Sequence, residues 1–87
     1  MKSSTTEQFR RRFAALPKEI QQLARKSYRV WQGNPQHPSL HFKKVGEYWS
    51  VRISDQYRAL GRIKDETMYW FWVGSHDEYE RQILSKR

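Results

Sequence analysis

Residues 48–64 read YWSVRISDQYRALGRIK, and apolar and polar side chains alternate on both sides of the polar segment Ser54-Asp55-Gln56. A period of two predicts two antiparallel strands, and the short polar segment between them predicts a hairpin loop. If the loop holds these three residues, the facing pairs on one side are Trp49 with Gly61, Val51 with Ala59, and Ile53 with Tyr57. This side is apolar, so we expect it to be the core face on which helices pack.

The other side of the same hairpin is basic. The register places Arg52 opposite Arg58 and Tyr48 opposite Arg62. Like charges that face each other across a strand pair are destabilising, and neither strand contains an Asp or Glu to offset them. A guanidinium group offers a planar fork that fits the oxygens of a phosphate. The hairpin therefore predicts an anion site at Arg52 and Arg58; the alternative is that both are solvated surface charges.

The segments around the hairpin predict the remaining elements. Ser4-Thr5-Thr6-Glu7 has the spacing of a capping box, so we expect a helix over about 5–15, and a second one over 17–33. Strands are expected at 40–45, 48–53, 57–63 and 68–73, followed by a short helix at 76–84. This order predicts an α+β domain in which a helical hairpin packs on a three- to four-stranded antiparallel sheet, with a short C-terminal helix.

Length and composition narrow the function classes. A chain of 87 residues is expected to form a single domain, 1–87. The net charge of +8 attracts polyanions, which makes nucleic acid the first partner to consider. The absence of cysteine excludes disulfides, iron–sulfur clusters and a thiol nucleophile. No apolar run reaches the roughly 20 residues of a membrane span and no secretory signal is visible, so we expect a cytoplasmic protein without a membrane partner.

The segment at 68–73 is almost wholly apolar, so its two faces depend on the turn before it. A three-residue turn puts Trp70 and Trp72 on the basic side, with Trp72 beside Arg58. The side chains left for the core are then Tyr69, Phe71 and Val73. A shift of one residue exchanges the two sets. Rings interleaved with basic groups bind single-stranded nucleic acid, and Trp72 is therefore a candidate RNA contact; the alternative is that both Trp lie in the core or at a partner interface.

His76 is the candidate for acid–base chemistry. It follows Gly74-Ser75 directly at the end of the last strand, where a side chain can project over the sheet. A His titrates near neutral pH and can act as acid or base in phosphodiester cleavage, while Arg52 and Arg58 hold the phosphate and its developing charge. The histidines have no metal-ligand spacing and no carboxylate pair joins them. We therefore expect a metal-independent reaction and no cofactor.

The other basic residues and histidines have smaller expected roles. The residues expected to steer a polyanion to the site are Lys43, Lys44 and Arg62. His41 could border the basic side, and His37 in the proline-containing loop is expected to be structural. The run from Arg10 to Arg12 is expected to be a solvated helix face rather than a binding patch.

Several short motifs follow one another along the chain: Leu16-Pro17, Asn34-Pro35, Trp49-Ser50-Val51-Arg52-Ile53, Tyr57-Arg58 and Gly74-Ser75-His76-Asp77-Glu78-Tyr79. Together with the order of helices and strands, they resemble the RelE/ParE toxin superfamily of bacterial toxin–antitoxin systems over nearly the whole chain. The resemblance implies the fold given above. For the RelE branch it also implies a ribonuclease that cuts mRNA in the ribosomal A site.

The resemblance implies roles for individual residues. In the RelE branch, basic residues of the central strands bind and polarise the scissile phosphate so that the 2′-hydroxyl can attack it, and Arg52 and Arg58 fall on matching strand positions. His76 matches the point where members carry an Arg or a His as general acid. Tyr79 is near the place where some members use a C-terminal aromatic residue. The implied partners are RNA, the ribosome and an antitoxin whose acidic segment covers the sheet.

Two departures from the superfamily pattern keep other functions open. Ser50 stands at a strand position that is often basic, and only residues 1–4 remain for the N-terminal strand that opens many members, so we expect the sheet to lose or shorten an edge. The ParE branch shares the fold but inhibits DNA gyrase, and a degenerate or solitary relative binds nucleic acid or a protein without catalysis. His76 favours the RelE branch. The sequence predicts no particular oligomeric state.

Overall fold

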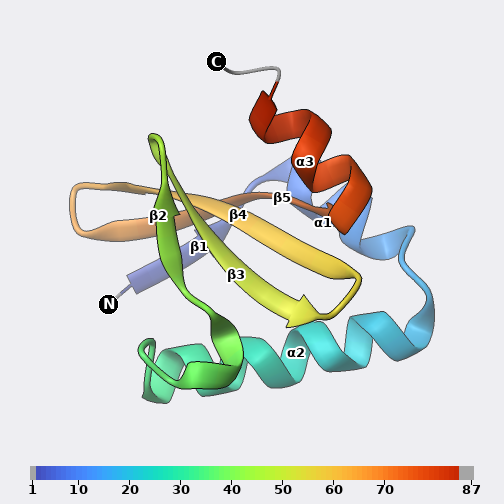
Figure 1. Cartoon of the computed structure of the whole chain (residues 1–87). Coiled ribbons are helices and arrows are strands. Elements are labelled where there is room, and N and C mark those ends of the chain that lie inside the picture. Colours follow the sequence, from blue (N-terminus) through green and yellow to red (C-terminus); the bar gives the residue numbers. More distant parts are fainter. Residues whose placement is uncertain (1, 85–87) are drawn as a thin grey trace.

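The computed structural model of the chain describes residues 2–84. The elements follow in the order β1 (Lys2–Thr5), α1 (Glu7–Ala14), α2 (Lys18–Gly33), the 3₁₀ turn η1 (Pro38–Leu40), β2 (Lys43–Val45), β3 (Tyr48–Ser54), β4 (Tyr57–Lys64), β5 (Thr67–Ser75) and α3 (His76–Leu84). The strands form one sheet in the order β1-β5-β4-β3-β2. Helices α1 and α2 pack on one side of it, and α3 follows β5 onto the other side (Figure 1). The predicted α+β class is confirmed.

The β3–β4 hairpin keeps the predicted register over most of its length. The pairs that match are Trp49 with Gly61, Ser50 with Leu60, Val51 with Ala59, and Arg52 with Arg58. A bulge after Arg52 makes Ser54, rather than the predicted Ile53, the partner of Tyr57. Ile53 is still buried with Val51 in the core under the helices, so the apolar side of the hairpin is the core face.

The register of β5 differs from the expected one at two places. The turn before it has two residues, Asp65 and Glu66, both with positive φ (51° and 64°), so Lys64 pairs with Thr67. Two consecutive positive φ values are typical of the tight hairpin turn that matches the twist of the strands. A bulge follows at Phe71, because Gly61 pairs with Trp70 and Leu60 pairs with Trp72. The prediction of a three-residue turn and an unbroken register is therefore wrong.

The bulge sends the two tryptophans of β5 to opposite sides of the sheet. Trp70 lies in the helix-covered core, where its ring meets that of Trp31 edge-on at 5.3 Å between centroids. Trp70 also covers Gly61, since a Cβ at that glycine would lie 2.8 Å from the ring. Trp72 lies on the far side, as predicted. Of the expected core set, Val73 is in the core, whereas Tyr69 is exposed and Phe71 packs on the far side.

The residues Lys2–Thr5 form an edge strand, and the helix that was predicted to begin at about Thr5 begins at Glu7. β1 pairs in parallel with β5, from Lys2 opposite Thr67 to Thr5 opposite Trp70. α1 starts later because Thr6 is its N-cap, with its Oγ1 accepting a hydrogen bond from the Phe9 backbone N–H at 3.1 Å. The sheet therefore has five strands in a mixed arrangement, and the N-terminal edge that we expected to be lost or shortened is present.

The helices cover different strands of the core face. α1 packs on β5 and α2 packs on β3. On α2, Ala24 and Trp31 are buried, whereas Leu23 is exposed. The strand predicted from Leu40 begins only at Lys43, because Leu40 is buried in η1. Within residues 2–84, no helix has both the length and the apolar character needed to cross a membrane.

Candidate functional site

The side of the sheet that faces away from α1 and α2 carries the predicted phosphate-binding pair. We define this side as the basic face. Its cations lie on three neighbouring strands: Lys43 on β2, Arg52 on β3, and Arg58 and Arg62 on β4. Arg52 and Arg58 are opposite each other, as the sequence predicted. The structure therefore brings the two guanidinium groups together on a sheet face that the first two helices do not cover.

The cations farther from this pair do not all share its side. Directly paired residues of a sheet point to the same face. Lys43 pairs with Ser50 and belongs to the basic face, whereas Lys44 pairs with Trp49 and so lies on the helix side. Arg62 is exposed, with its guanidinium 5.2 Å from the centroid of the Tyr48 ring. Lys43 and Arg62 therefore border the site, and Lys44 does not.

Both central arginines are held by residues at or next to the turn that joins β3 and β4. Arg52 forms an ion pair with Asp55, and its Nη1 lies 3.5 Å from Nε2 of His41. Arg58 donates through Nη1 to the carbonyl oxygen of Ser54 at 2.6 Å. The carboxylate that the strands lack thus comes from the loop. The side chain of Asp55 is 80% exposed, so its ion pair with Arg52 is open to exchange with another anion.

The pKa of Arg58 is lowered by its surroundings, which include its partial burial and the charge of Arg52. Partial burial lowers that pKa below its ordinary value, the charge of Arg52 lowers it further, and Tyr79 acts in the opposite direction. Arginine keeps its charge at neutral pH despite such a shift. Because an anion between the two groups would offset both the burial and the repulsion, this pair favours a phosphate-like ligand.

His76 lies where β5 passes into α3. Gly74 pairs with Arg58 and Ser75 pairs with Tyr57, so the start of α3 is one strand away from Arg58. The backbone N–H of His76 donates to the carbonyl oxygen of Gln56 at 2.6 Å, which fixes α3 to the β3–β4 loop. The helix α3 thus begins at His76, directly after the Gly74-Ser75 end of β5, as the motif predicted.

The side chain of His76 faces two residues of its own helix. Its Nδ1 lies 3.6 Å from Oε1 of Glu80, and its ring centroid lies 6.0 Å from that of Tyr79. The imidazole therefore lies beside a carboxylate and an aromatic ring of its own helix. Among residues 2–84, no three His, Asp or Glu side chains are grouped so as to hold a metal ion.

Trp72 lies under α3 rather than on an open surface. It is 3% exposed, and it forms a second small core with Tyr48 and Leu60. Its ring lies 6.5 Å from that of Tyr79 and 4.9 Å from the guanidinium carbon of Arg12. Stacking of this ring on a base, the candidate role of Trp72, would need α3 to move away, and its burial agrees with the alternative of a core position.

Two residues near the site were not identified from the sequence, Arg12 and Glu78. Arg12 donates from Nε to the carbonyl oxygen of Val73 at 2.7 Å and from Nη2 to Oε2 of Glu78 at 3.0 Å. The other carboxylate oxygen of Glu78 accepts from the backbone N–H of Ser75 at 3.0 Å. The Ser75 N–H and, next, Arg12 hold the pKa of Glu78 below its ordinary value. The Ser-x-x-Glu spacing of a capping box at 75–78 is the sequence signal that could have found Glu78.

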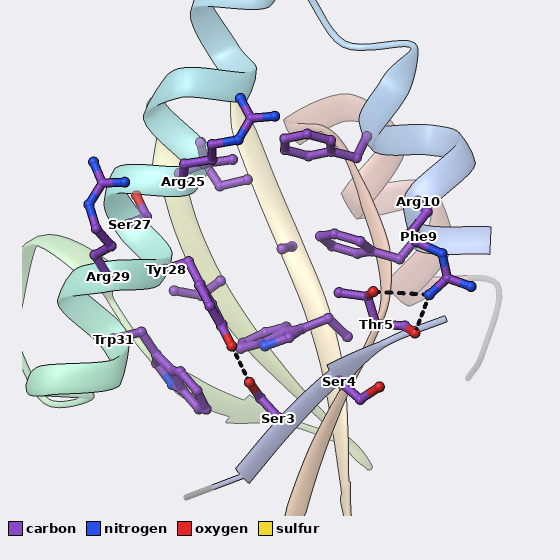
Figure 2. A pocket seen from close by; sticks show the side chains of 16 residues that line it. Ser3, Ser4, Thr5, Phe9, Arg10, Arg25, Ser27, Tyr28, Arg29 and Trp31 are labelled. Carbon is purple, nitrogen blue, oxygen red and sulfur yellow. Dashed lines mark hydrogen bonds between the residues drawn. The ribbon is translucent and has the colours of Figure 1, made fainter. Parts of the chain in front are cut away.

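A groove of about 780 Å³ lies on the opposite side of the sheet, between α1 and α2 (Figure 2). Figure 2 shows Tyr28 of α2 and Ser3 of β1 joined by a hydrogen bond at one end of it. The apolar side chains that line it include Phe9, Phe13, Trp31, Val51, Ala59 and Trp70, and its arginines are Arg10, Arg25 and Arg29. Among the described residues 2–84, no histidine and no carboxylate lines it. The residues suited to phosphodiester chemistry are therefore on the basic face and not in this groove.

The comparison with protein families identifies the chain. The family model of the ParE-like toxin domain matches residues 18–81. This range includes α2, all strands except β1, and the first part of α3. The protein therefore belongs to the ParE-like toxin domain family. No curated protein matches its sequence.

Solved toxin structures share the fold over nearly their whole length. The RelB–RelE antitoxin–toxin complex from Methanococcus jannaschii is 15% identical over 90% of this chain and 95% of that one, with a TM-score of 0.71. YafQ from E. coli is 9% identical over 88% and 94%, with a TM-score of 0.72. The YoeB/ParE toxin from Agrobacterium tumefaciens is 15% identical over 87% and 99%, with a TM-score of 0.69. The resemblance to the RelE/ParE superfamily is confirmed.

Proposed function

We propose that the protein is a toxin-type endoribonuclease that cleaves mRNA at the ribosome in the cytoplasm. The observation that carries this proposal is the facing pair of Arg52 and Arg58 with His76 one strand away, at an end of the sheet that α1 and α2 leave uncovered. Membership in a toxin family and the net charge of +8 support it. A polyanion is the partner that such a surface attracts.

In the proposed reaction, the scissile phosphate lies between Arg52 and Arg58. The 2′-hydroxyl oxygen attacks phosphorus and loses its proton to solvent, while the bond from phosphorus to the 5′-oxygen breaks. Protonated His76 gives its proton to that leaving oxygen, and the products are a 2′,3′-cyclic phosphate and a 5′-hydroxyl end. The two arginines stabilise the extra negative charge on the phosphoryl oxygens in the transition state, and Tyr79 restrains the imidazole. These steps need no metal ion.

Binding of RNA exchanges partners at the arginine pair. Arg52 leaves the exposed carboxylate of Asp55, and Arg58 leaves the carbonyl oxygen of Ser54. An exposed ion pair is worth only about 0–1 kcal/mol, so the resting contacts oppose phosphate binding weakly. They also hold both side chains on the basic face before RNA arrives, which reduces the ordering that binding requires.

Cleavage of mRNA on ribosomes tests this proposal. We expect His76→Ala and Arg58→Ala each to cut at least about 100-fold more slowly than the parent, because the general acid and the charge stabilisation are typically worth this much. Arg29→Ala is the matched control, since Arg29 lies on α2 at the groove on the opposite side. Unchanged cutting by both site variants would remove the proposed active site.

We also propose an antitoxin partner with an acidic segment that covers the basic face. The support is that the similar structure from M. jannaschii is an antitoxin–toxin complex, and that the exposed cations Lys43 and Arg62 border this face. An acidic segment over Arg52 and Arg58 would occupy the place of the phosphate. Such a partner would inhibit by competition, so it should lower RNA binding without altering the fold.

A second candidate function is inhibition of DNA gyrase without RNA cleavage. The observation that favours it is the family match, which is to a ParE-like toxin domain. Expression in cells separates the two functions. A ribonuclease stops translation first and leaves plasmid supercoiling intact, whereas a gyrase inhibitor changes supercoiling and causes DNA damage while translation continues. His76→Ala should abolish the first phenotype and leave the second.

A further inference from the structure

Beyond the end of β1, the edge of β5 is hydrogen-bonded by the backbone of Thr6 and the side chain of Arg12, and not by a strand. β1 pairs with β5 only as far as Trp70. The next bond to this edge comes from the backbone N–H of Thr6, which donates to the carbonyl oxygen of Trp70 at 3.0 Å. Beyond it, Nε of Arg12 donates to the carbonyl oxygen of Val73 at 2.7 Å. An arginine of α1 thus takes the place of a strand partner where β5 approaches the site.

The same guanidinium group continues past the edge to α3. Its Nη2 donates to Oε2 of Glu78 at 3.0 Å, and its carbon lies 4.9 Å from the centroid of the Trp72 ring. Gly74 makes room for it, since a Cβ there would lie 2.7 Å from Nη2 of Arg12 and 2.8 Å from Trp72. One conformation of Arg12 therefore binds the carbonyl oxygen of Val73 and the carboxylate of Glu78. The same conformation places the guanidinium group over the ring of Trp72 and in the space left by Gly74.

Glu78 connects Arg12 to the first turn of α3. One of its carboxylate oxygens accepts from both the N–H and the Oγ of Ser75, at 3.0 and 3.1 Å, and its own N–H donates to that Oγ at 3.2 Å. His76 lies within this capped turn, and Tyr79 follows Glu78 directly. A shift of Glu78 would therefore move both residues of α3 that belong to the candidate active site.

We propose that Arg12 is a positioning residue that fixes the first turn of α3 and thereby holds His76 and Tyr79 against Arg58. Its catalytic consequence rests on the proposed ribonuclease function, but its effect on α3 is measurable without RNA. Arg11 is the matched control. It also belongs to α1 and also pairs with a carboxylate, Glu7 at 2.6 Å, but its side chain is 77% exposed and both partners lie on the same helix.

The experiment compares the parent with Arg12→Gln, Arg12→Lys, Glu78→Gln and Arg11→Gln. Amide hydrogen exchange of α3 and the kcat and KM of RNA cleavage are measured for each. We expect Arg12→Gln and Glu78→Gln to speed exchange in α3 about tenfold, the usual effect of losing a hydrogen bond between charged groups. The kcat should fall about tenfold while KM changes less than twofold, because phosphate binding stays with Arg52 and Arg58. Arg12→Lys should recover part of both effects, and Arg11→Gln should change neither.

Each outcome decides the inference. Unchanged exchange of α3 in both Arg12→Gln and Glu78→Gln overturns it, and so does faster exchange with an unchanged kcat. Glu78→Gln leaves α1 and its bond to β5 in place, so it serves as the test if Arg12→Gln fails to fold. A parent protein that cleaves no RNA would instead contradict the proposed function, and the exchange rates alone would then decide whether Arg12 anchors α3.

Discussion

The two faces of the sheet are held together by different forces, although they share the same strands. On the helix side, apolar groups such as Val51, Ile53 and Trp70 pack against α1 and α2. On the basic face, Arg52 is fixed by an ion pair with Asp55 and Arg58 by a hydrogen bond to the carbonyl oxygen of Ser54. Because side chains alternate along a strand, a change at one position should alter stability and a change at the next should alter activity. Four predictions follow from this separation, and the first concerns the core.

Trp70→Ala should have the largest effect. The ring is 4% exposed and packs against Trp31 and over Gly61. Truncation of a buried Trp costs about 3–5 kcal/mol, which is a large part of the stability of a small domain. Urea unfolding measures the loss. Tyr69→Ala is the control, since the neighbouring Tyr69 is 40% exposed, and equal losses in the two variants would contradict the assignment of faces.

Arg58→Ala should show the opposite behaviour. We expect cleavage to fall by about 100- to 1000-fold, as for other groups that stabilise transition-state charge. The free energy of unfolding should change by less than about 1 kcal/mol, because the loss of the hydrogen bonds to the carbonyl oxygens of Ser54 and Tyr57 is offset by relief of the partial burial of the charge and of the repulsion from Arg52. Kinetics and urea unfolding of the same preparation check both parts. A variant that loses activity only through unfolding would contradict the separation of the two faces.

The neighbours Lys43 and Lys44 provide a finer test, because they lie on opposite faces. Each phosphate contact on a single strand changes the slope of log K against log salt by about 0.7. Lys43→Ala should therefore reduce the salt dependence of RNA binding by about one contact, whereas Lys44→Ala should leave the slope unchanged. Binding of a short single-stranded RNA at several salt concentrations measures this. A slope that responds equally to both substitutions would indicate attraction by net charge alone.

The smallest effect expected is a pH dependence from Glu78. Its pKa is lowered in the folded protein, first by the Ser75 N–H and then by Arg12. The stabilisation is therefore complete above the ordinary glutamate pKa of about 4.3 and is lost as pH falls through the lower folded value. We expect Glu78→Gln to reduce the Tm slightly at neutral pH and to flatten its decline below about pH 4.3. If the Tm of Glu78→Gln declined below about pH 4.3 in the same way as the Tm of the parent, Glu78 would not contribute to the pH dependence of stability.

The residues that the sequence predicted best belong to the hairpin of β3 and β4. Alternation there separates apolar from basic positions, and the polar loop sets the register, so the pairing of Arg52 with Arg58 could be predicted. The same approach was wrong in β5, because the turn before it has two residues instead of the expected three, and because an apolar run has no alternation to reveal either that shift or the bulge at Phe71. Trp70 was consequently assigned to the wrong face, whereas the burial of Trp72 agrees with the alternative of a core position.

Contacts between distant segments explain what else was missed. The four residues of β1 form a short polar segment that lacks the alternating pattern of a strand. They are a strand because they pair with β5, a contact that the local sequence does not reveal. The ion pair of Arg12 with Glu78 joins positions far apart in the chain, and Arg12 looks in sequence like its solvated neighbour Arg11. His76 and the start of α3 were predicted well, because the strand ends and the helix begins within the local motif at 74–79.

The pairing of β1 with β5 has a consequence for the timing of assembly during synthesis. Lys2 needs Thr67 as its neighbour, so the first strand made must wait for the last one. Contacts between remote segments form slowly, and a growing chain can close them only when both segments have left the ribosome. α2 and the β2–β3–β4 meander can form earlier, while β1 and the edge that Arg12 completes come last. A nascent chain would therefore complete the edge of β5 that Arg12 occupies only after β5 itself has left the ribosome.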